Sequence, residues 1–523
     1  MEVFGLELEF ITAMNRSQTE AWKVIIVLAT MALVAVWRWL PRRAGLALLL
    51  TLGVWSTGNY FRYDTRTVGQ KYDTYDLLHY YLNAKYFDEL GYYDLYPACM
   101  LADLENDGPY FKRQGTLYMA QNDAGHGRMP IAHGVDRGRK VRENHFTEAR
   151  WSAFEHDFLM LQRSGASKLN DKLWRQMIID HGYNGTPAWT VMARPIANIV
   201  PVESIKLLGY LDLAVLLAAA ATVAWAYGAP TALFAWVFLM VSYSLRWPMI
   251  SWAFLRYDYV AALMVGMALL KKQKHALAGL FTAYSATMRL FPAMWLYGPG
   301  MKGLAGLTRK TVHRPLLILA GSFFFGVAAI EGAAVLSLGG DTVQTHLTNM
   351  LDHNSSEQLS SRRIGLALAL PYRGERLPKF IEPERKELIE VQKPLRYGLA
   401  GVVMLLLGWG LRRADDDETF ALGFVPFFLL TTASYYYYVT RVTLVMLHAR
   451  DLRRPRNVFG LLMLLAIEAF GNWSESAHSG HRVFLVGTTA WMLMAYCITM
   501  TVWFNLEAYR AERSQSSGAS ANP

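Results

Sequence analysis

Long apolar runs recur along the chain and are separated by short polar segments. A run of roughly 17 to 25 apolar residues predicts a membrane-spanning helix, because the hydrocarbon core requires about that length. Candidate spans lie at residues 22–39, 44–58, 206–227, 229–245, 254–270, 315–336, 397–412, 419–436, 437–449, 457–470 and 484–503. Two shorter runs, 275–289 and 290–304, are interrupted by Pro292 and Pro299 and are predicted to form a broken pair that enters the membrane and returns.

This pattern predicts an all-α, polytopic integral membrane protein with a helical bundle of about 11–13 transmembrane helices. The predicted regions are N-terminal transmembrane helices (1–58), a hydrophilic loop region with amphipathic helices (59–205), a central transmembrane bundle (206–336), a second hydrophilic loop (337–396), C-terminal transmembrane helices (397–505) and a disordered tail (506–523). The tail is assigned from its small and polar residues, "RSQSSGASANP", which bury too little apolar surface to fold.

Five short basic loops predict the orientation of the chain in the membrane. They read "WLPRRAG", "KKQKH", "KGLAGLTRKTVHR", "GLRRADDDE" and "HARDLRRPRN", and all fall on one side if every candidate segment crosses. Lys and Arg in short loops collect on the cytoplasmic side. The segments 59–205 and 337–396 are therefore predicted to lie on the outer face of a plasma membrane, here taken as a bacterial inner membrane.

Composition narrows the classes of function. The net charge of +10 is assigned to cytoplasmic anchoring rather than to nucleic-acid binding, because no aromatic and basic stripe accompanies it. The two cysteines, Cys99 and Cys497, fall in different predicted regions, so neither a disulfide nor a cysteine zinc site is expected. The acidic run "ADDDETF" (414–420) could be either a metal site or a charged segment exposed to solvent. Its predicted position on the cytoplasmic side favours a solvated charge run.

The stretch "QKYDTYDLLHYYLNAKYFDELGYYDLYPA" follows the second predicted span. As a helix it places Asp73, Asp76, Tyr80 and Asn83 near one face. Two interpretations of the aspartates stay open. Asp73 would cap the helix with Asp76 in its first turn, or Asp76, with Asp73 as the second candidate, would be a catalytic base that takes a proton from a sugar or lipid hydroxyl. The tyrosines suit either an interfacial belt or a surface for sugar rings and lipid headgroups.

Within this stretch, "DLLHYYLNAKYFDELGYYDLY" resembles the first outer-loop pattern of GT-C glycosyltransferases, in particular the group that uses polyprenol-phosphate mannose. Three further stretches are similar to that group in the same order: "YNGTPAWTVMARPIANIVPVESIKLL", "LAGLFTAYSATMRLFPAMWLYGPGMKGLAG" and "LDHNSSEQLSSRRIGL". The resemblance implies a GT-C-like bundle that moves a hexose, with mannose as the default, from polyprenyl phosphate to a lipid or glycan acceptor on the outer face. The implied partners are membrane lipids, this lipid-linked sugar and the acceptor, without nucleic acid.

Such a transfer needs positive charge beside the departing phosphate. The predicted phosphate-binding residues are Arg256, Arg289, His353, Asn354 and Arg362, the last with Arg363 beside it. The alternatives are that Arg256 snorkels to the membrane surface, that His353 and Asn354 lie in a solvated loop, and that Arg362 and Arg363 anchor to headgroups.

The remaining predictions concern the substrate and rival functions. Predicted substrate-binding residues are His79, Tyr80, Asn83, Asp258 and His346. No cofactor and no metal is expected, since a lipid monophosphate is a leaving group that needs less metal assistance than a diphosphate. The rival functions are another membrane transferase, such as an oligosaccharide ligase or a lipid acyl or phosphoryl transferase, and a lipid or sugar transporter. A transporter predicts charged residues deep in several spans.

Overall fold

The computed structural model describes residues 2–3, 6–7, 14–64, 72–108, 118–119, 129–164, 183–246, 249–353, 362–377 and 383–519. Helices dominate these residues, which confirms the predicted all-α class. The strands are three antiparallel pairs of two-residue strands: β1 (Glu2–Val3) with β2 (Leu6–Glu7), β3 (Tyr118–Met119) with β4 (Met129–Pro130), and β5 (Arg363–Ile364) with β6 (Ala433–Ser434).

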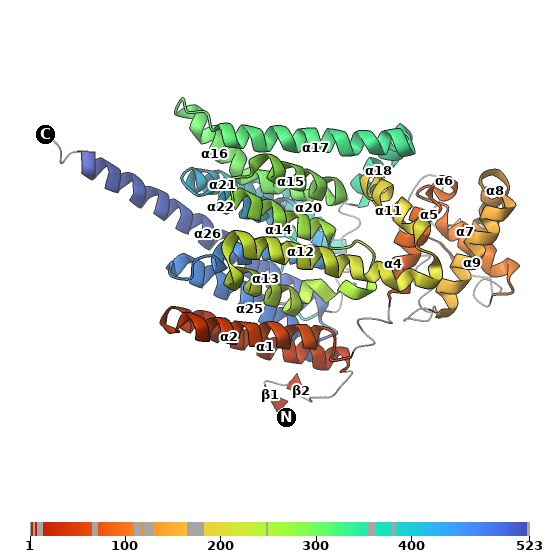
Figure 1. Ribbon diagram of the computed structural model, residues 1–523, viewed down its shortest axis with the longest axis horizontal. Helices are drawn as coiled ribbons and strands as arrows, with labels where there is room; N and C mark the ends of the chain where they lie inside the picture. The colour runs from red at the N-terminus through yellow and green to blue at the C-terminus, as the bar shows by residue number, and fades with distance from the viewer. Residues whose placement is uncertain are drawn as a thin grey trace.

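The bundle consists of roughly parallel and antiparallel helices of very different lengths (Figure 1). They are α1 (Arg16–Val36), α2 (Arg42–Tyr60), α12 (Gly209–Tyr227), α13 (Ala229–Val241), α14 (Asp258–Lys271), α15 (His275–Arg289), α16 (Tyr297–Thr308), α17 (Arg314–Leu338), α21 (Lys393–Leu411), α22 (Asp416–Ala421), α23 (Phe424–Leu430), α24 (Val442–Ala449), α25 (Pro455–Ala477) and α26 (Arg482–Ala519). Tight 3₁₀ turns join or extend them: η1 (Trp37–Trp39), η3 (Val202–Leu208), η4 (Tyr243–Arg246), η5 (Ile250–Trp252), η6 (Phe291–Leu296) and η8 (Tyr435–Arg441).

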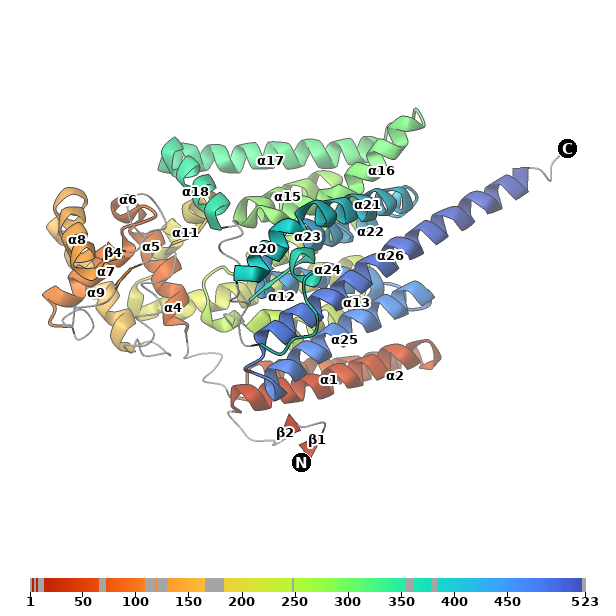
Figure 2. The same ribbon diagram turned by 180° about the vertical axis from the view of Figure 1, so that it is seen from behind.

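A second set of helices lies at one end of the bundle. They are α4 (Thr74–Leu77), the π-helical turn η2 (Leu78–Leu82), α5 (Asn83–Lys85), α6 (Phe87–Leu90), α7 (Leu95–Glu105), α8 (Ile131–His145), α9 (Glu148–Ser164), α11 (Pro187–Ile199), α18 (Gly340–His353), α19 (Leu366–Ala369) and α20 (Pro383–Val391). Helices α4 to α9 form a group at this end, and we call them the outer helices after the prediction that they lie on the outer face. Figure 2 shows α18 between that group and the bundle. The turns α1–α2 and α16–α17, which carry two of the basic loops, lie at the opposite end.

Six helical segments are long and apolar enough to span a membrane, so the chain is a membrane protein. They are Arg16–Trp39, Val202–Tyr227, Arg314–Leu338, Lys393–Leu411, Pro455–Ala477 and Arg482–Ser514. A seventh is added if Ala229–Val241 and Tyr243–Trp252, which meet at 61°, count as one broken span. These six or seven segments, found by length and composition among the described residues, are fewer than the 11–13 helices we expected.

Two of the runs that we predicted to be membrane-spanning helices do not form single helices. The run 419–436 divides into α22, α23, β6 and the start of η8, and the run 437–449 into the rest of η8 and α24. All of these are too short to cross a bilayer alone. Their apolar residues are buried against other helices, as Phe427 and Val445 show with no exposed surface. Hydropathy cannot distinguish such a buried segment from one that faces lipid.

The predicted broken pair at 275–304 is present. Helix α15 ends at Arg289, Leu290 takes a positive φ of 49°, and η6 and α16 follow. Pro292 lacks the backbone N–H that would continue the helix, so the chain turns here. The break places Arg289 at the end of a helix rather than within one.

The far C-terminal region differs from the sequence prediction. Helix α26 ends at Ala519 and so covers most of the segment 506–523, which we predicted to be disordered. The Glu512 carboxylate contacts Arg412 (2.9 Å) and Arg309 (3.4 Å). These ion pairs attach α26 to the turns that follow α16 and α21, and the composition of the tail does not indicate such contacts.

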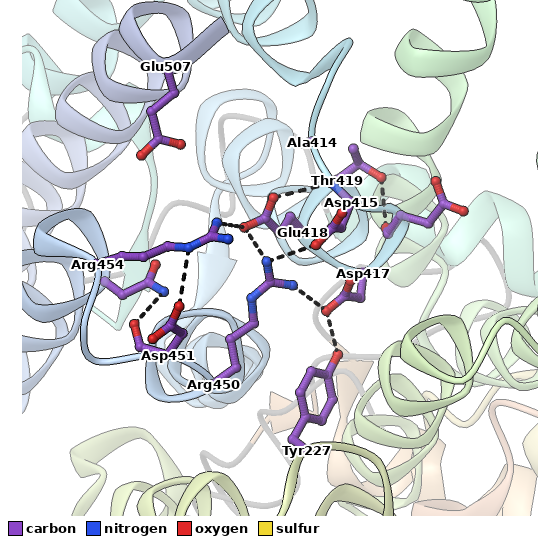
Figure 3. A network of polar contacts seen from close by, with 12 residues as sticks. Tyr227, Ala414, Asp415, Asp417, Glu418, Thr419, Arg450, Asp451, Arg454 and Glu507 are labelled. Atoms are coloured by element: carbon purple, nitrogen blue, oxygen red, sulfur yellow. Dashed lines mark hydrogen bonds and ion pairs between the residues drawn. The ribbon is translucent and has the colours of Figure 1, made fainter. Parts of the chain in front are cut away.

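The acidic run 414–420 is not a solvated charge run, contrary to our prediction. Asp417 and Glu418 are 3% and 4% exposed. Figure 3 shows Arg450 between them, 2.7 Å from Asp417 and 2.5 Å from Glu418, with the Tyr227 hydroxyl donating to Asp417 at 2.9 Å. Arg456 reaches Glu418 at 2.6 Å. The sequence did not indicate this burial because the basic partners, Arg450 and Arg456, follow the run only after α23, η8 and α24.

A second ion pair lies fully inside the bundle. Arg441, at the end of η8, and Glu468, in α25, have no exposed surface, and Nη2 lies 2.7 Å from Oε1. Glu468 also accepts the backbone N–H of Tyr243 at 2.9 Å. The pair fastens η8 to α25, so the four consecutive tyrosines of η8 are held at a fixed place in the bundle.

Candidate functional site

A cavity of about 710 Å³ lies between the outer helices and the end of the bundle. Its wall combines three kinds of side chain. Aromatic residues include Tyr80, Tyr436 and Tyr437, basic residues include Arg289 and Arg363, and apolar residues include Phe291, Phe427 and Leu430. The segments that supply them are far apart in the sequence. The cavity therefore exists only when the outer helices pack on the bundle.

Arg289 supplies the clearest positive charge of the cavity. It is half-buried, its Nη1 donates to the carbonyl of Met288 (2.9 Å), and its guanidinium lies 5.7 Å from the ring centroid of Tyr259. Among the described residues no carboxylate lies within ion-pair distance of it. A guanidinium without a carboxylate on a cavity wall is suited to receive an anion.

Strained backbone accompanies both candidate arginines. Leu290, next to Arg289, has φ of 49°, and Leu255, next to Arg256, has φ of 50°. A positive φ costs a branched, non-glycine residue roughly 1 to 3 kcal/mol, and such strain clusters at functional sites. Of the two neighbouring arginines, Arg256 stacks on Tyr80 and Arg289 lines the cavity together with Tyr80.

Asp76 and Arg256 form an ion pair behind the cavity wall. Arg256 Nε lies 3.2 Å from Asp76 Oδ1, and the guanidinium stacks 4.4 Å from the ring centroid of Tyr80. Both side chains are largely buried, and neither lines the cavity. Burial raises the pKa of the Asp76 carboxyl, and the Arg256 charge acts in the opposite direction. The Tyr80 ring therefore separates this ion pair from the cavity.

Asp73 adopts the helix-capping position that was one of its two interpretations. Its carboxylate accepts the backbone N–H groups of Tyr75 (3.0 Å) and Asp76 (3.3 Å) at the start of α4. Burial, together with the Asp76 charge, raises its pKa to about 6. Asp73 does not line the cavity.

His79 and Asn83 point into the outer helical group rather than the cavity. The His79 ring contacts the Tyr75 carbonyl (2.7 Å) and the Tyr96 hydroxyl, and the Asn83 amide donates to the Gly91 carbonyl (2.9 Å). Helix η2 carries an extra residue in its turn, which rotates the following positions away from the face expected of a regular α-helix. Tyr80, within that turn, reaches the cavity and donates to Asn184 at 2.5 Å.

Asp258 is a second buried aspartate in the region of Arg289. Tyr284 donates to its Oδ2 at 2.8 Å, whereas its Oδ1 is buried without a hydrogen-bond partner among the described residues. Asp258 does not line the cavity. Its negative charge attracts the Arg289 guanidinium without forming an ion pair with it.

Of the residues predicted on α18, the structure brings His346 to the cavity. Its ring centroid lies 6.0 Å from that of Tyr92 at an interplanar angle of 30°, and burial with the Arg289 charge lowers its pKa to about 4. His346 is therefore a neutral hydrogen-bonding group near pH 7. His353 ends α18, and its side chain lies outside the described part, as does all of Asn354.

The adjacent arginines of the second outer loop separate in the structure. Arg362 is exposed and does not line the cavity, whereas Arg363 is 4% exposed and does. Arg363 begins the short strand β5 and is buried against β6, whereas Arg362 precedes the strand. Sequence alone gave no strand here, because its partner β6 lies in a distant segment.

Two cavity residues, Tyr436 and Tyr437, were not among the predicted site residues. Their rings lie 4.5 Å apart, and Tyr437 also packs on Phe291 at 5.1 Å. The run "YYYY" at 435–438 was the available signal. In the 3₁₀ turn η8, Tyr435 and Tyr438 are buried while the middle two reach the cavity, a division that cannot be read from four identical residues.

No protein-family model, no curated protein and no solved structure matches the chain. The GT-C fold and the likeness to polyprenol-phosphate-mannose enzymes therefore stay predictions. Among the described residues no group of three or more His, Cys, Asp or Glu side chains is placed to hold a metal ion. The site must be judged from its own geometry.

Proposed function

We propose that the chain is a glycosyltransferase that moves a hexose from a polyprenyl-phosphate donor to a lipid or glycan acceptor on the outer face of the membrane. The observation that carries this proposal is Arg289, which has no carboxylate within ion-pair distance among the described residues and lies on the wall of an aromatic and apolar cavity at the predicted outer end of the bundle. Mannose remains the default hexose from the sequence resemblance, and a bacterial inner membrane the default location.

Each part of the donor has a matching surface in the cavity. The phosphate suits the guanidinium of Arg289. The sugar ring suits the faces of Tyr80, Tyr436 and Tyr437. The polyprenyl chain suits the apolar wall, where Leu290 and Leu430 are 55% and 40% exposed.

The proposed reaction is a substitution at the anomeric carbon of the hexose. The acceptor oxygen forms a bond to this carbon, the bond from the carbon to the phosphate oxygen breaks, and polyprenyl phosphate leaves with the electron pair. The acceptor proton passes to a base, for which Asp76 is the candidate. Because Asp76 is paired with Arg256 behind Tyr80, its role requires Tyr80 to move or to relay the proton.

A transporter remains the second candidate, and one observation favours it. Lys23 in α1, Arg441 and Glu468 are charged side chains buried within the bundle, as a transporter predicts. However, Arg441 and Glu468 neutralise each other without lining the cavity, and the network around Arg450 ties the cytoplasmic ends together. A transport cycle would have to break that network.

Two assays on one preparation separate these functions. The purified full chain is reconstituted in liposomes that contain a polyprenyl-phosphate hexose labelled in the sugar, together with lipids from the native membrane. A transferase moves the label to a new product and leaves free polyprenyl phosphate. A transporter moves the intact lipid between leaflets without chemical change, and that result would overturn the proposal. An oligosaccharide ligase would instead require a diphosphate-linked glycan.

A further inference from the structure

One part of the cavity wall is aromatic, polar and neutral. The outer helices, the segment before α11 and helix α18 contribute it. We call it the outer patch, and its members are Tyr80, Tyr92, Tyr183, Asn184, His346 and Asn349. Except for Tyr80, none of these residues has a role in the function proposed so far.

Aromatic rings in direct contact form the base of the outer patch. The ring centroids of Tyr80 and Tyr183 lie 6.0 Å apart, and those of Tyr183 and Tyr92 lie 5.6 Å apart. The His346 ring lies 6.0 Å from Tyr92. The Tyr92 hydroxyl donates to the Gly185 carbonyl at 3.0 Å, which connects the outer helices to the segment that carries Asn184. The rings therefore form one continuous surface although three separate segments supply them.

The polar side chains of the outer patch have nitrogen atoms that are available for a ligand. Asn184 Oδ1 accepts the Tyr80 hydroxyl, and Asn349 Oδ1 accepts the Tyr93 hydroxyl, each at 2.5 Å. Within the described part of the chain, neither amide nitrogen has a hydrogen-bond partner, and neither do the ring nitrogens of His346. His346 and Asn349 are three positions apart in α18 and so lie on one face of that helix.

The outer patch also lacks charge. Burial, together with the Arg289 charge, lowers the pKa of His346 to about 4, so this histidine is neutral near pH 7. Among the described residues of the cavity wall, the charged side chains come from other elements: Arg289 from α15, Arg363 from β5, and the others from α20 and α21. The wall therefore contains a neutral group of residues in addition to its charged ones.

This combination of groups is suited to an uncharged polyhydroxy ligand. An amide nitrogen donates to a hydroxyl oxygen, and a neutral imidazole donates at one nitrogen and accepts at the other, so both can pair with hydroxyl groups. The aromatic rings offer an apolar surface to the C–H groups of a sugar ring. An anionic headgroup would find no cation in the outer patch, and an ammonium headgroup would meet N–H donors of like partial charge.

Tyr80 connects the outer patch with the candidate base. The Arg256 guanidinium lies 4.4 Å from the ring centroid of Tyr80, and Arg256 is paired with Asp76 at 3.2 Å. A hydroxyl group bound at the outer patch would therefore lie on the cavity side of the same tyrosine that covers Asp76. This is where an acceptor has to bind if its proton is to pass to Asp76.

We propose that the outer patch binds the acceptor, and that the acceptor presents an uncharged carbohydrate there rather than a charged lipid headgroup. This inference rests on the proposed function for the role of the ligand as acceptor. Binding of a carbohydrate at the outer patch is a separate property, so it can be measured whether or not hexose is transferred.

Binding of small probes to the full chain in nanodiscs tests the inference. The probes are the neutral disaccharides mannobiose and cellobiose, the anionic glycerol phosphate, and glycerophosphoethanolamine, which carries an ammonium group. Saturation-transfer NMR measures their affinity. The variants His346→Phe and Asn349→Leu keep the size of each side chain and remove its nitrogens. Tyr93→Phe is the matched control, because it removes the same hydrogen bond to Asn349 but keeps the amide.

The wild type should bind at least one of the neutral disaccharides. His346→Phe and Asn349→Leu should each bind it about tenfold more weakly, because each variant loses a hydrogen bond to the ligand and leaves a ligand hydroxyl unpaired. Tyr93→Phe should bind it much as the wild type does. The two variants should not weaken any binding of glycerol phosphate or glycerophosphoethanolamine, because those probes would bind elsewhere in the cavity.

The inference is overturned if the wild type binds neither disaccharide, or if both variants bind as the wild type does. It is also overturned if the variants weaken a headgroup probe as strongly as a disaccharide, because the outer patch then accepts a charged ligand. Equal weakening by Tyr93→Phe and Asn349→Leu would likewise overturn it, since Asn349 would then only support the fold.

The outcomes for the outer patch and for the proposed function can be distinguished. A chain that transfers hexose but shows any of these contrary results keeps the proposed function and loses the carbohydrate subsite. A chain that shows the expected binding pattern but transfers no hexose from polyprenyl phosphate keeps the carbohydrate subsite and loses the proposed function.

Discussion

Arg256 forms an ion pair with Asp76, with Nε 3.2 Å from Oδ1, and its guanidinium covers the inner face of Tyr80. The outer helix α4 and the bundle thus meet through opposite charges, directly behind the cavity that contains Arg289. A buried pair of this kind either supports the wall or takes part in proton transfer. The two roles have different consequences for variants.

Asp76→Asn is expected to lower turnover by a factor on the order of 10² to 10⁴, the usual contribution of a positioned base. It is also expected to lower the unfolding temperature, because Arg256 loses its charged partner inside the protein. Adding Arg256→Gln should restore much of the thermal stability without restoring turnover. If the double variant regains turnover as well, Asp76 is a structural partner of Arg256 and the base lies elsewhere.

Asp73 should make stability depend on pH in the acidic range. Burial and the nearby Asp76 raise the pKa of Asp73 from its ordinary value of 3.8 to about 6, so the folded chain holds this proton more tightly than the unfolded chain. Its protonation therefore favours folding at low pH, and this contribution is lost as the pH rises from about 3.8 to about 6.

The measurement is the unfolding temperature in detergent of wild type and Asp73→Asn across this range. Asparagine keeps the helix cap and does not titrate. The difference between the two proteins should change in favour of Asp73→Asn as the pH rises. A difference that is constant with pH would contradict the assigned environment of Asp73.

The sequence predicted the features that depend on local pattern. The all-α class, the break after Arg289 and the cap at Asp73 follow from hydropathy, Pro292 and the spacing of two aspartates. The sequence did not predict the features that depend on contacts between distant segments of the chain. The choice of Arg363 over Arg362 depends on β6, and the burial of Glu418 depends on Arg450 and Arg456. A local feature was also missed, because the π-helical turn around Tyr80 rotates Asn83, which follows it, away from the expected face.

The buried pair Arg441–Glu468 should be a strong contributor to stability as long as both members are present. Arg441→Met leaves Glu468 buried without its counter-charge and is expected to lower the free energy of unfolding by about 3 to 5 kcal/mol. The double variant with Glu468→Gln should recover part of this loss. As a control, Arg139→Met removes an exposed pair with Asp136 and should cost about 1 kcal/mol at most. Equal losses for the two arginines would contradict the burial described.

Surface labelling tests the orientation in the membrane. The native cysteines Cys99 and Cys497 are both buried, so introduced cysteines can be followed. Glu143→Cys, exposed on α8, should react with an impermeant maleimide in intact cells. Val312→Cys, in the exposed turn between α16 and α17, should react only after lysis. The opposite pattern would place the cavity on the cytoplasmic side.

The most direct test of the account is hexose transfer from labelled polyprenyl-phosphate hexose by the wild type, Arg289→Lys and Arg289→Met, with Arg362→Gln as the control. Within the described part of the chain the Arg289 side chain makes one hydrogen bond, to the neighbouring carbonyl, so its replacement should leave the fold intact. We predict transfer by the wild type and the control, reduced transfer by Arg289→Lys because a point charge replaces the bidentate fork, and little transfer by Arg289→Met. Transfer by Arg289→Met at the wild-type rate, or no transfer by the wild type with native acceptor lipids, would contradict the central claim.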